Sequence, residues 1–403
     1  MNGAFLKNPC VFTLIFLCSF RISSHQYQLN ITWLSPVVSN GPCLGSLIGD
    51  PKQADDCATW TRHEAASPLF DAARNMIYVG GSDGLLHVVS ARDGALKKNI
   101  KLPEGNLHAK PVLWENHLFF GTSAGDIIKM DPGTGNIVWK LKVDAEVENQ
   151  IVLQGSTLFV VTGAATIYAV DAVTGTILWN QKRPLPPHIF IGTISNPLLV
   201  SINETGEKLI LICGHPSGRV DFYEAKTGKA IFNVMVGDLT SEFPDVAASP
   251  VFNQGSVIVA SFNRGIVSLD PSTGEIRWKL AEKEKTKLAA AEGLIFAAGN
   301  KSVIAMNAQD GKVVWRFTFD KGAPTEMIIK NGFLYFASAP GALYVLKANT
   351  GMPVRYIGSG QGFAGEFDFS SNQLFAISTA GYLYAMSPDF KGIVQRAISS
   401  ALF

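Results

Sequence analysis

Asp131-Pro-Gly-Thr-Gly-Asn-Ile-Val-Trp139 is a turn-and-strand motif that recurs along the chain. Its close copies are Asp171-Ala-Val-Thr-Gly-Thr-Ile-Leu-Trp179, Asp270-Pro-Ser-Thr-Gly-Glu-Ile-Arg-Trp278 and Asn307-Ala-Gln-Asp-Gly-Lys-Val-Val-Trp315. Counting three weaker copies, the turn glycines are Gly94, Gly135, Gly175, Gly228, Gly274, Gly311 and Gly351. Their mean spacing is about 43 residues, which is the length of one four-stranded propeller blade.

The motif has a direct physical interpretation. The Asp carboxylate can accept hydrogen bonds from backbone amides of the turn, and the Gly supplies a positive φ. The Trp lies on the following strand, where it offers a flat face to the next unit and can donate its indole N–H to a backbone carbonyl. We therefore assign a structural role to Trp33, Asp131, Gly135, Trp139, Asp171, Gly175, Trp179, Asp270, Gly274, Trp278, Gly311 and Trp315.

The units predict a closed ring. Each has two apolar strands before the motif, as in residues 333–338 and 342–347, and short strands between turns indicate an all-β protein. The eighth unit, residues 373–387, lacks a Trp strand, and Gln28-Leu-Asn-Ile-Thr-Trp33 supplies it. We expect an eight-bladed β-propeller of four-stranded antiparallel blades, closed by this N-terminal strand so that no sheet edge stays open. The alternative, a β-solenoid, usually has shorter rungs.

The N-terminus predicts export. Lys7 precedes an apolar run at 10–20 that is too short to span a bilayer, and small residues follow it. We assign residues 1–24 to a signal peptide and residues 25–403 to a single propeller domain, periplasmic or secreted. The alternatives are an uncleaved anchor and a lipid attached to Cys18.

The composition argues against several classes of ligand. The chain has 403 residues, and its 34 Lys and Arg against 33 Asp and Glu leave a net charge of +1. This balance gives no electrostatic case for nucleic acid or an anionic membrane, although it is compatible with a local patch. The histidines are dispersed, so no metal site is expected. The charge run at 282–287 is expected to be solvated.

Two cysteines are expected to pair. Cys43 and Cys57 flank a loop without strand or helix periodicity, and in an oxidising compartment a disulfide would stabilise it. Cys213 lies in an apolar strand and is expected to be a buried free thiol.

The Asp-x-x-Thr-Gly-x-x-x-Trp pattern, over about residues 28–390, resembles the pyrroloquinoline-quinone (PQQ) type of propeller repeat. Three classes share this fold: quinoprotein dehydrogenases, outer-membrane assembly lipoproteins of the BAM complex, and secreted ligand-binding propellers. Dehydrogenases of this type usually carry an adjacent cysteine pair and inserted calcium ligands. Since this chain has no Cys-Cys pair and near-minimal blades, we expect no cofactor and no enzyme activity.

Length, export signal, blade count and closing strand resemble the BAM-complex family. The resemblance implies a non-enzymatic monomer that works within a complex in outer-membrane β-barrel assembly. Its partner would be an envelope protein, the barrel-assembly subunit, and not nucleic acid. The alternatives are a PQQ-dependent oxidoreductase and a secreted ligand-binding propeller.

The resemblance also implies partner-binding residues. These are Ile189, Phe190 and Ile191 in one loop and Asp245 in another. Gly192 stands where the family has an Arg, and Ala247 replaces a second acid, so the partner surface differs from that of the family. Three consecutive apolar residues cannot all face one side of a strand. They are either ordinary blade core or an exposed patch of the kind that marks a partner site.

Overall fold

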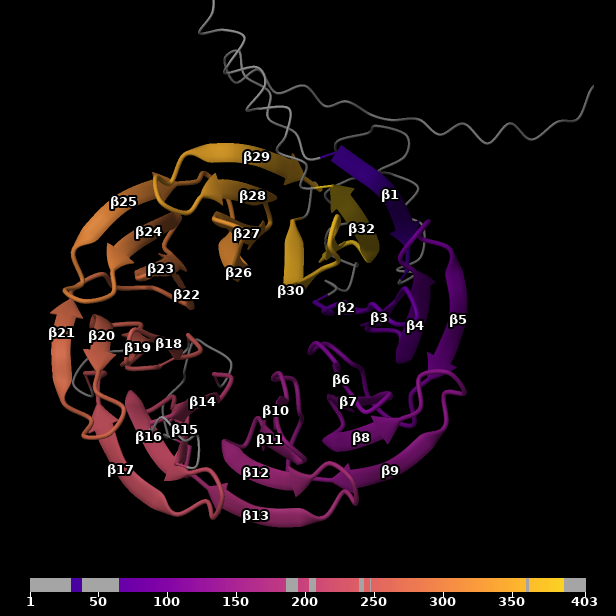
Figure 1. Cartoon of the computed structure of the whole chain (residues 1–403), viewed down its shortest axis with the longest axis horizontal. Helices are drawn as coiled ribbons and strands as arrows, with labels where there is room; N and C mark the ends of the chain where they lie inside the picture. Colours follow the sequence, from indigo (N-terminus) through magenta and orange to yellow (C-terminus); the bar gives the residue numbers. More distant parts are fainter. Residues whose placement is uncertain are drawn as a thin grey trace, which may run out of the picture.

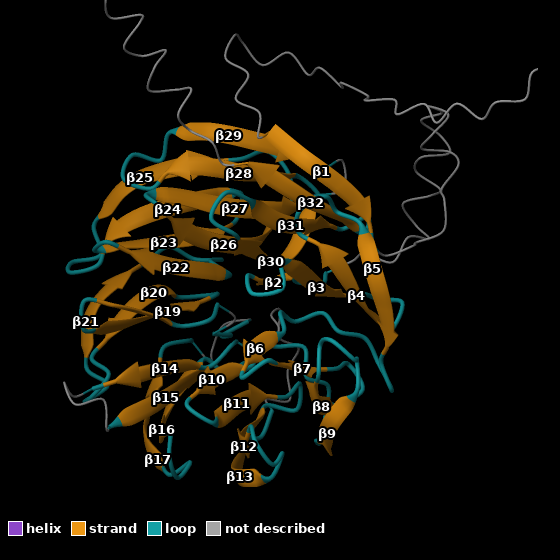
Figure 2. Cartoon of the chain, turned by 45° about the vertical axis from the view of Figure 1, so that its right-hand side comes forward, coloured by secondary structure: helices purple, strands orange, loops and turns teal. Residues whose placement is uncertain are grey.

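The computed structural model describes residues 30–37, 65–185, 195–202, 208–238, 243–246, 248–359 and 362–387. These residues form eight four-stranded antiparallel sheets, arranged as blades around a central axis (Figure 1). The described chain contains strands and loops only (Figure 2), and no helix in it could cross a membrane. The prediction of an all-β, eight-bladed propeller is confirmed.

The strands of each blade follow from the axis outward in chain order, except in blade 8. Blade 1 has β2 (Leu69–Asp71), β3 (Met76–Gly80), β4 (Leu85–Ser90) and β5 (Leu96–Lys101), and blade 2 has β6 (Val112–Trp114), β7 (His117–Gly121), β8 (Asp126–Met130) and β9 (Ile137–Lys142). Blade 3 has β10 (Val152–Gln154), β11 (Thr157–Val161), β12 (Thr166–Asp171) and β13 (Ile177–Lys182), and blade 4 has β14 (Leu198–Ser201), β15 (Leu209–Gly214), β16 (Arg219–Glu224) and β17 (Ala230–Met235). Blade 5 has β18 (Val251–Asn253), β19 (Ser256–Ser261), β20 (Gly265–Leu269) and β21 (Ile276–Leu280), and blade 6 has β22 (Lys287–Ala291), β23 (Leu294–Gly299), β24 (Ser302–Asn307) and β25 (Val313–Thr318). Blade 7 has β26 (Ala323–Lys330), β27 (Phe333–Ala339), β28 (Ala342–Lys347) and β29 (Pro353–Gly358), and blade 8 has β30 (Phe363–Phe369), β31 (Leu374–Ser378), β32 (Tyr382–Ser387) and β1 (Asn30–Pro36).

The core lies between neighbouring blades. The two middle strands of each blade are mostly apolar and are largely buried on both faces, as β7 and β8 are. Between blades 2 and 3, Phe119 and Ile127 pack against Leu158 and Val170. Burying both faces of every sheet in this way requires a neighbour on each side, which explains why the blades form a ring.

The repeated motif joins neighbouring blades at five of the junctions described. Asp131 Oδ1 accepts hydrogen bonds from the backbone N–H of Gly133 and Thr134, both at 2.8 Å. Trp139 donates its indole N–H to Ala172 O at 3.2 Å, and a Cβ on Gly175 would lie 2.7 Å from the Trp139 ring. The same pairing joins Trp33 to Gly94, Trp179 to Gly228, Trp278 to Gly311, and Trp315 to Gly351.

The N-terminal strand closes the ring, as predicted. β1 pairs antiparallel with β32 and forms the outermost strand of blade 8 (Figure 1). Trp33 donates its indole N–H to Ala91 O of blade 1 at 3.1 Å. Blade 8 is therefore built from both ends of the described chain.

The propeller has two unlike faces. One carries the Asp-x-x-Thr-Gly turns. The other, which we call the connection face, carries the turns between the two middle strands of each blade and the links from one blade to the next, such as 143–151. The assigned signal peptide, residues 1–24, lies outside the described residues, and the division into leader and single domain stays a prediction.

Candidate functional site

The loops with the predicted partner residues belong to the connection face. Ile189, Phe190 and Ile191 lie outside the described residues, and the described chain resumes at Ser195. Ser195 Oγ accepts a hydrogen bond from Gly214 N at 3.1 Å. A Cβ on Gly214 would lie 2.7 Å both from Ser195 Oγ and from Val246 Cγ1. Ser195, which follows the segment with Ile189 to Ile191, and Val246, which follows Asp245, therefore meet at the same turn of blade 4.

Asp245 is itself buried, with 2% of its surface exposed. Its carbonyl accepts a hydrogen bond from Phe262 N at 2.9 Å, and Val246 N donates to His215 O at 3.3 Å. These bonds tie the link between blades 4 and 5 to a turn of each blade. The partner-binding role of Asp245 stays a prediction.

A buried ionic cluster that the sequence analysis missed lies beside this turn. Arg183 is 3% exposed, and its Nη1 lies 3.1 Å from Asp221 Oδ2. The guanidinium also donates to Ala165 O at 3.2 Å and to Gly214 O at 3.3 Å. Arg219 Nε lies 3.2 Å from the second oxygen of Asp221. The cluster fixes the point at which the chain leaves β13 for residues 186–194.

The sequence carried a signal for this cluster, namely a break in the repeat. Arg183 stands four residues after the motif Trp, where blades 2 and 6 have Val143 and Phe319. Asp221 stands three residues before the turn, where blade 2 has Ile128. Charged residues at positions that are apolar in most of the other blades would have revealed the pair.

His215 completes the cluster as a neutral side chain. Ser217 N–H donates to His215 Nδ1 at 3.1 Å, which assigns the ring proton to Nε2. Burial, together with the charge of Arg183, lowers the pKa of His215 to about 4. Neither His215 Nε2 nor Arg183 Nη2 has a hydrogen-bond partner in the structure as described.

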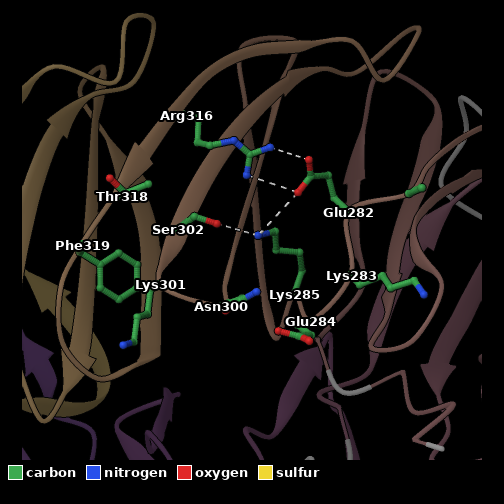
Figure 3. A pocket seen from close by; sticks show the side chains of 11 residues that line it. Glu282, Lys283, Glu284, Lys285, Asn300, Lys301, Ser302, Arg316, Thr318 and Phe319 are labelled. Atoms are coloured by element: carbon green, nitrogen blue, oxygen red, sulfur yellow. Dashed lines mark hydrogen bonds and ion pairs between the residues drawn. The ribbon is translucent and has the colours of Figure 1, made fainter.

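A polar groove of about 610 Å³ lies on the same face, at blade 6 (Figure 3). Arg316 forms a two-pronged ion pair with Glu282, and Lys285 Nζ donates to Ser302 Oγ at 2.8 Å and to Gly299 O at 3.3 Å. The Lys285 side chain is 2% exposed, and burial lowers its pKa. The expectation that residues 282–287 are solvated is therefore wrong at Lys285, because its ammonium is held inside by these acceptors.

The central channel is lined by equivalent residues of the innermost strands or the links just before them. In blades 1 to 8 these are Ser67, Lys110, Gln150, Asn196, Ser249, Lys287, Glu326 and Glu366. All but Lys110 line a cavity of about 460 Å³. In several blades, the side chain accepts a hydrogen bond from the backbone of the preceding blade. Gln150 N donates to Asn196 Oδ1 at 3.0 Å, Asn196 N to Ser249 Oγ at 3.0 Å, and Glu366 N to Ser67 Oγ at 2.9 Å.

Charge gathers on one side of this channel. Burial raises the pKa of Glu326, and Lys287 Nζ lies 3.9 Å from that carboxylate. Burial, together with the charge of Glu326, raises the pKa of Glu366 to about 7. Across the channel mouth, Lys110 Nζ lies 3.1 Å from Asp368. The described residues include no group of three His, Cys, Asp or Glu side chains placed to hold a metal ion.

Glu366→Gln is expected to raise the free energy of unfolding at about pH 8 by about 2 kcal/mol. The Glu366 pKa is about 7 when folded against 4.5 for the free side chain, so the folded state holds more protons between these values. Protonated Glu366 therefore stabilises the wild-type protein fully below pH 4.5, and this contribution is lost as the pH rises through 7. Gln stays uncharged, so the variant gains over the wild type as the pH rises. Urea unfolding of both proteins across this range measures it. The exposed Glu275→Gln is the matched control, and a flat wild-type profile would contradict the raised pKa.

Of the two predictions about cysteines, the structure tests only the one for Cys213. Cys43 and Cys57 lie outside the described residues, so their disulfide stays a prediction. Cys213 is a buried free thiol, as expected, and burial raises its pKa to about 12. A thiol with such a pKa is not a nucleophile near neutral pH.

Comparison with known proteins defines the family. A profile described as outer membrane protein assembly factor BamB matches residues 82–300, 263–354 and 299–389. Among proteins of that name, the one from Shewanella oneidensis is 24% identical over 245 residues, which is 60% of this chain and about half (51%) of that protein. The one from Yersinia pestis is 22% identical over 78% of this chain and 70% of its own. The one from Escherichia coli K12 is 27% identical over 69% of this chain and 73% of its own.

Solved structures share the fold. BamB from Moraxella catarrhalis has a TM-score of 0.67 at 17% identity and covers 81% of this chain and 96% of its own. A quinohemoprotein alcohol dehydrogenase from Pseudomonas putida has a TM-score of 0.62 at 10% identity and covers 81% of this chain and 74% of its own. At such identities the likeness concerns the fold alone. Since the family profile spans most of the chain, the chain belongs to the family of outer membrane protein assembly factor BamB.

Proposed function

We propose that the protein is a non-enzymatic scaffold for outer-membrane β-barrel assembly, working in the periplasm. The family match carries this proposal, and the relatives cited above are named as outer membrane protein assembly factors. The fold supports it, because each blade of a closed ring packs between two neighbours, which holds the attachment points of its loops rigidly. Loops that are already held in place lose less conformational entropy when a partner binds.

The proposed partner surface is the connection face around blades 4 and 5, and the proposed partner is the barrel-assembly subunit. Ile189, Phe190 and Ile191 would supply apolar contacts, with Asp245 supporting the neighbouring link. In favour of this surface, Ser195 and Val246 both lie against Gly214, while the Arg183–Asp221 pair holds the other end of the first segment. Both segments are thereby anchored to one rigid blade.

Replacing Ile189 and Ile191 together with Ser is expected to reduce recovery of the barrel-assembly subunit at least tenfold, since exposed apolar anchors dominate such interfaces. The measurement is co-purification from the native envelope, with thermal unfolding followed in parallel. The matched control replaces two exposed apolar residues of β25, Val313 and Val314, with Ser. Equal recovery with both variants contradicts the proposed surface, and collapse of the fold shows that the isoleucines are blade core.

The second candidate is a PQQ-dependent oxidoreductase or another secreted ligand-binding propeller. Its support is the polar channel of about 460 Å³ and the fold shared with a quinohemoprotein alcohol dehydrogenase. PQQ and Ca²⁺ added to the same preparation separate the two candidates. Saturable quinone absorbance together with dye reduction would replace the scaffold proposal.

A further inference from the structure

The outermost strands of the eight blades contain no acidic residue. In this chain, 34 basic residues are matched by 33 acidic ones, so the absence is a strong local bias. The basic residues on these strands are Lys97, Lys98, Lys101, Lys140, Lys142, Lys182, Arg277, Lys279, Arg316 and Arg355. The outer wall of the propeller is therefore basic although the chain as a whole is nearly neutral.

The bias is strongest on three consecutive blades. β5, β9 and β13 follow one another around the outer wall on consecutive blades (Figure 1), and we call their solvent-facing side the outer arc. All lysines of these strands are exposed, namely Lys97, Lys98, Lys101, Lys140, Lys142 and Lys182. Positive charge is thus concentrated on a convex surface of three adjacent strands.

Exposed aliphatic side chains lie among these lysines. In β9, a shift of register against β8 exposes two residues in succession, so that Ile137 is 41% and Val138 51% exposed. The same shift in β13 leaves Ile177 41% and Leu178 52% exposed. Leu96 of β5 is 47% exposed. Each strand of the outer arc therefore combines an apolar end with lysines.

Nearby acids neutralise only part of this charge. Lys140 and Lys142 lie 3.7 and 3.8 Å from the buried carboxylate of Asp126, and Lys142 lies 3.6 Å from Glu104. Lys98 occupies the position that the motif Trp has in other blades, and its ammonium donates to Thr134 O at 2.5 Å. Asp93 lies near Lys97 in the preceding turn. Lys101 and Lys182 form no ion pair within the described part of the chain.

We propose that the outer arc binds the surface of an anionic phospholipid bilayer. Lysine ammonium groups attract lipid phosphates without needing a fixed contact geometry, and exposed aliphatic side chains can enter the boundary between headgroups and acyl chains. Such attraction is reversible and weakens with salt. This binding is separate from recognition of a protein partner by the connection face, and would orient that face beside the membrane.

The test is vesicle co-sedimentation of residues 25–403. The apolar run at 10–20 is left out because it would bind vesicles by itself, and none of the described strands includes it. Vesicles made of equal parts of phosphatidylglycerol and phosphatidylcholine are compared with vesicles of phosphatidylcholine alone. The wild-type protein is expected to sediment with the anionic vesicles, less with the neutral ones, and less as salt is added.

Replacing Lys97, Lys101 and Lys182 together with Glu is expected to weaken binding to the anionic vesicles at least tenfold. The control replaces Lys226, Lys283 and Lys347 with Glu; these exposed lysines lie off the outer arc, and the change in net charge is the same. Retained binding by the control alone supports the proposal. It is overturned if the wild-type protein ignores anionic vesicles or if both variants lose binding equally. It is also overturned if reversal on the outer arc impairs only recovery of the barrel-assembly subunit, which would make the arc a protein-binding surface.

Discussion

Gly228→Ala is expected to lower the free energy of unfolding by about 3 kcal/mol. Gly228 ends the Asp-x-x-Thr-Gly-type turn of blade 4 with φ of 70°, and an added Cβ would lie 2.5 Å from the ring of Trp179 in blade 3. The substitution adds the cost of a positive φ to a clash that pushes the indole away from Ala225 O, its acceptor at 3.0 Å. Urea unfolding at fixed pH measures the loss.

Gly332→Ala separates these two contributions. Gly332 has φ of 75°, but a Cβ there would meet no atom within 4 Å. This variant should therefore lose only the backbone preference, about 1 kcal/mol. If both variants lose the same stability, the contact between Trp and Gly does not hold neighbouring blades together in the way described.

Asp221→Ala is expected to destabilise the protein by about 3 to 5 kcal/mol, because it leaves the Arg183 guanidinium buried without its countercharge. Arg183 and Asp221 are 3% and 5% exposed, and the ion pair joins the end of blade 3 to the middle of blade 4. Water cannot easily replace the carboxylate at such a depth. Thermal unfolding together with urea titration measures the change.

The combined variant Arg183→Val with Asp221→Ile restores the residues found at these positions in blade 2, Val143 and Ile128. Its stability should lie close to that of the wild-type protein, because a buried ion pair replaced by packed apolar side chains is often neutral. A double variant as unstable as Asp221→Ala would show that the cavity, and not the stranded charge, causes the loss.

The architecture was predictable because its signals are local. Asp131, Gly135 and Trp139 lie within one turn and one strand, and their recurrence determines the number and length of the blades. The closing strand was predictable by comparing the repeat units, since the eighth unit lacks a Trp strand and residues 28–33 resemble one. Periodic patterns of this kind do not depend on how the ring is finally assembled.

The candidate site was less predictable because it depends on contacts between blades. Arg183 and Asp221 are 38 positions apart, and nothing near either residue specifies the other. Lys285 looked solvated within its charge run, yet its acceptors lie at the end of β23 and the start of β24. The hydrogen bonds around the central channel require a closed ring, since Glu366 N donates to Ser67 Oγ although the two residues are 299 positions apart.

The pairing of β1 with β32 determines when the nascent chain can close its ring. Thr32 donates to Ala385 O, 353 positions further along the chain. β1 is therefore synthesised first among the described strands, but its partner β32 is synthesised last. Blades 1 to 7 can assemble in order as they leave the ribosome or the export channel, because their strands are neighbours in sequence. Until β32 follows, the molecule is a horseshoe with two unprotected ends. A stop codon anywhere before residue 382 would therefore leave both ends open to proteases and aggregation.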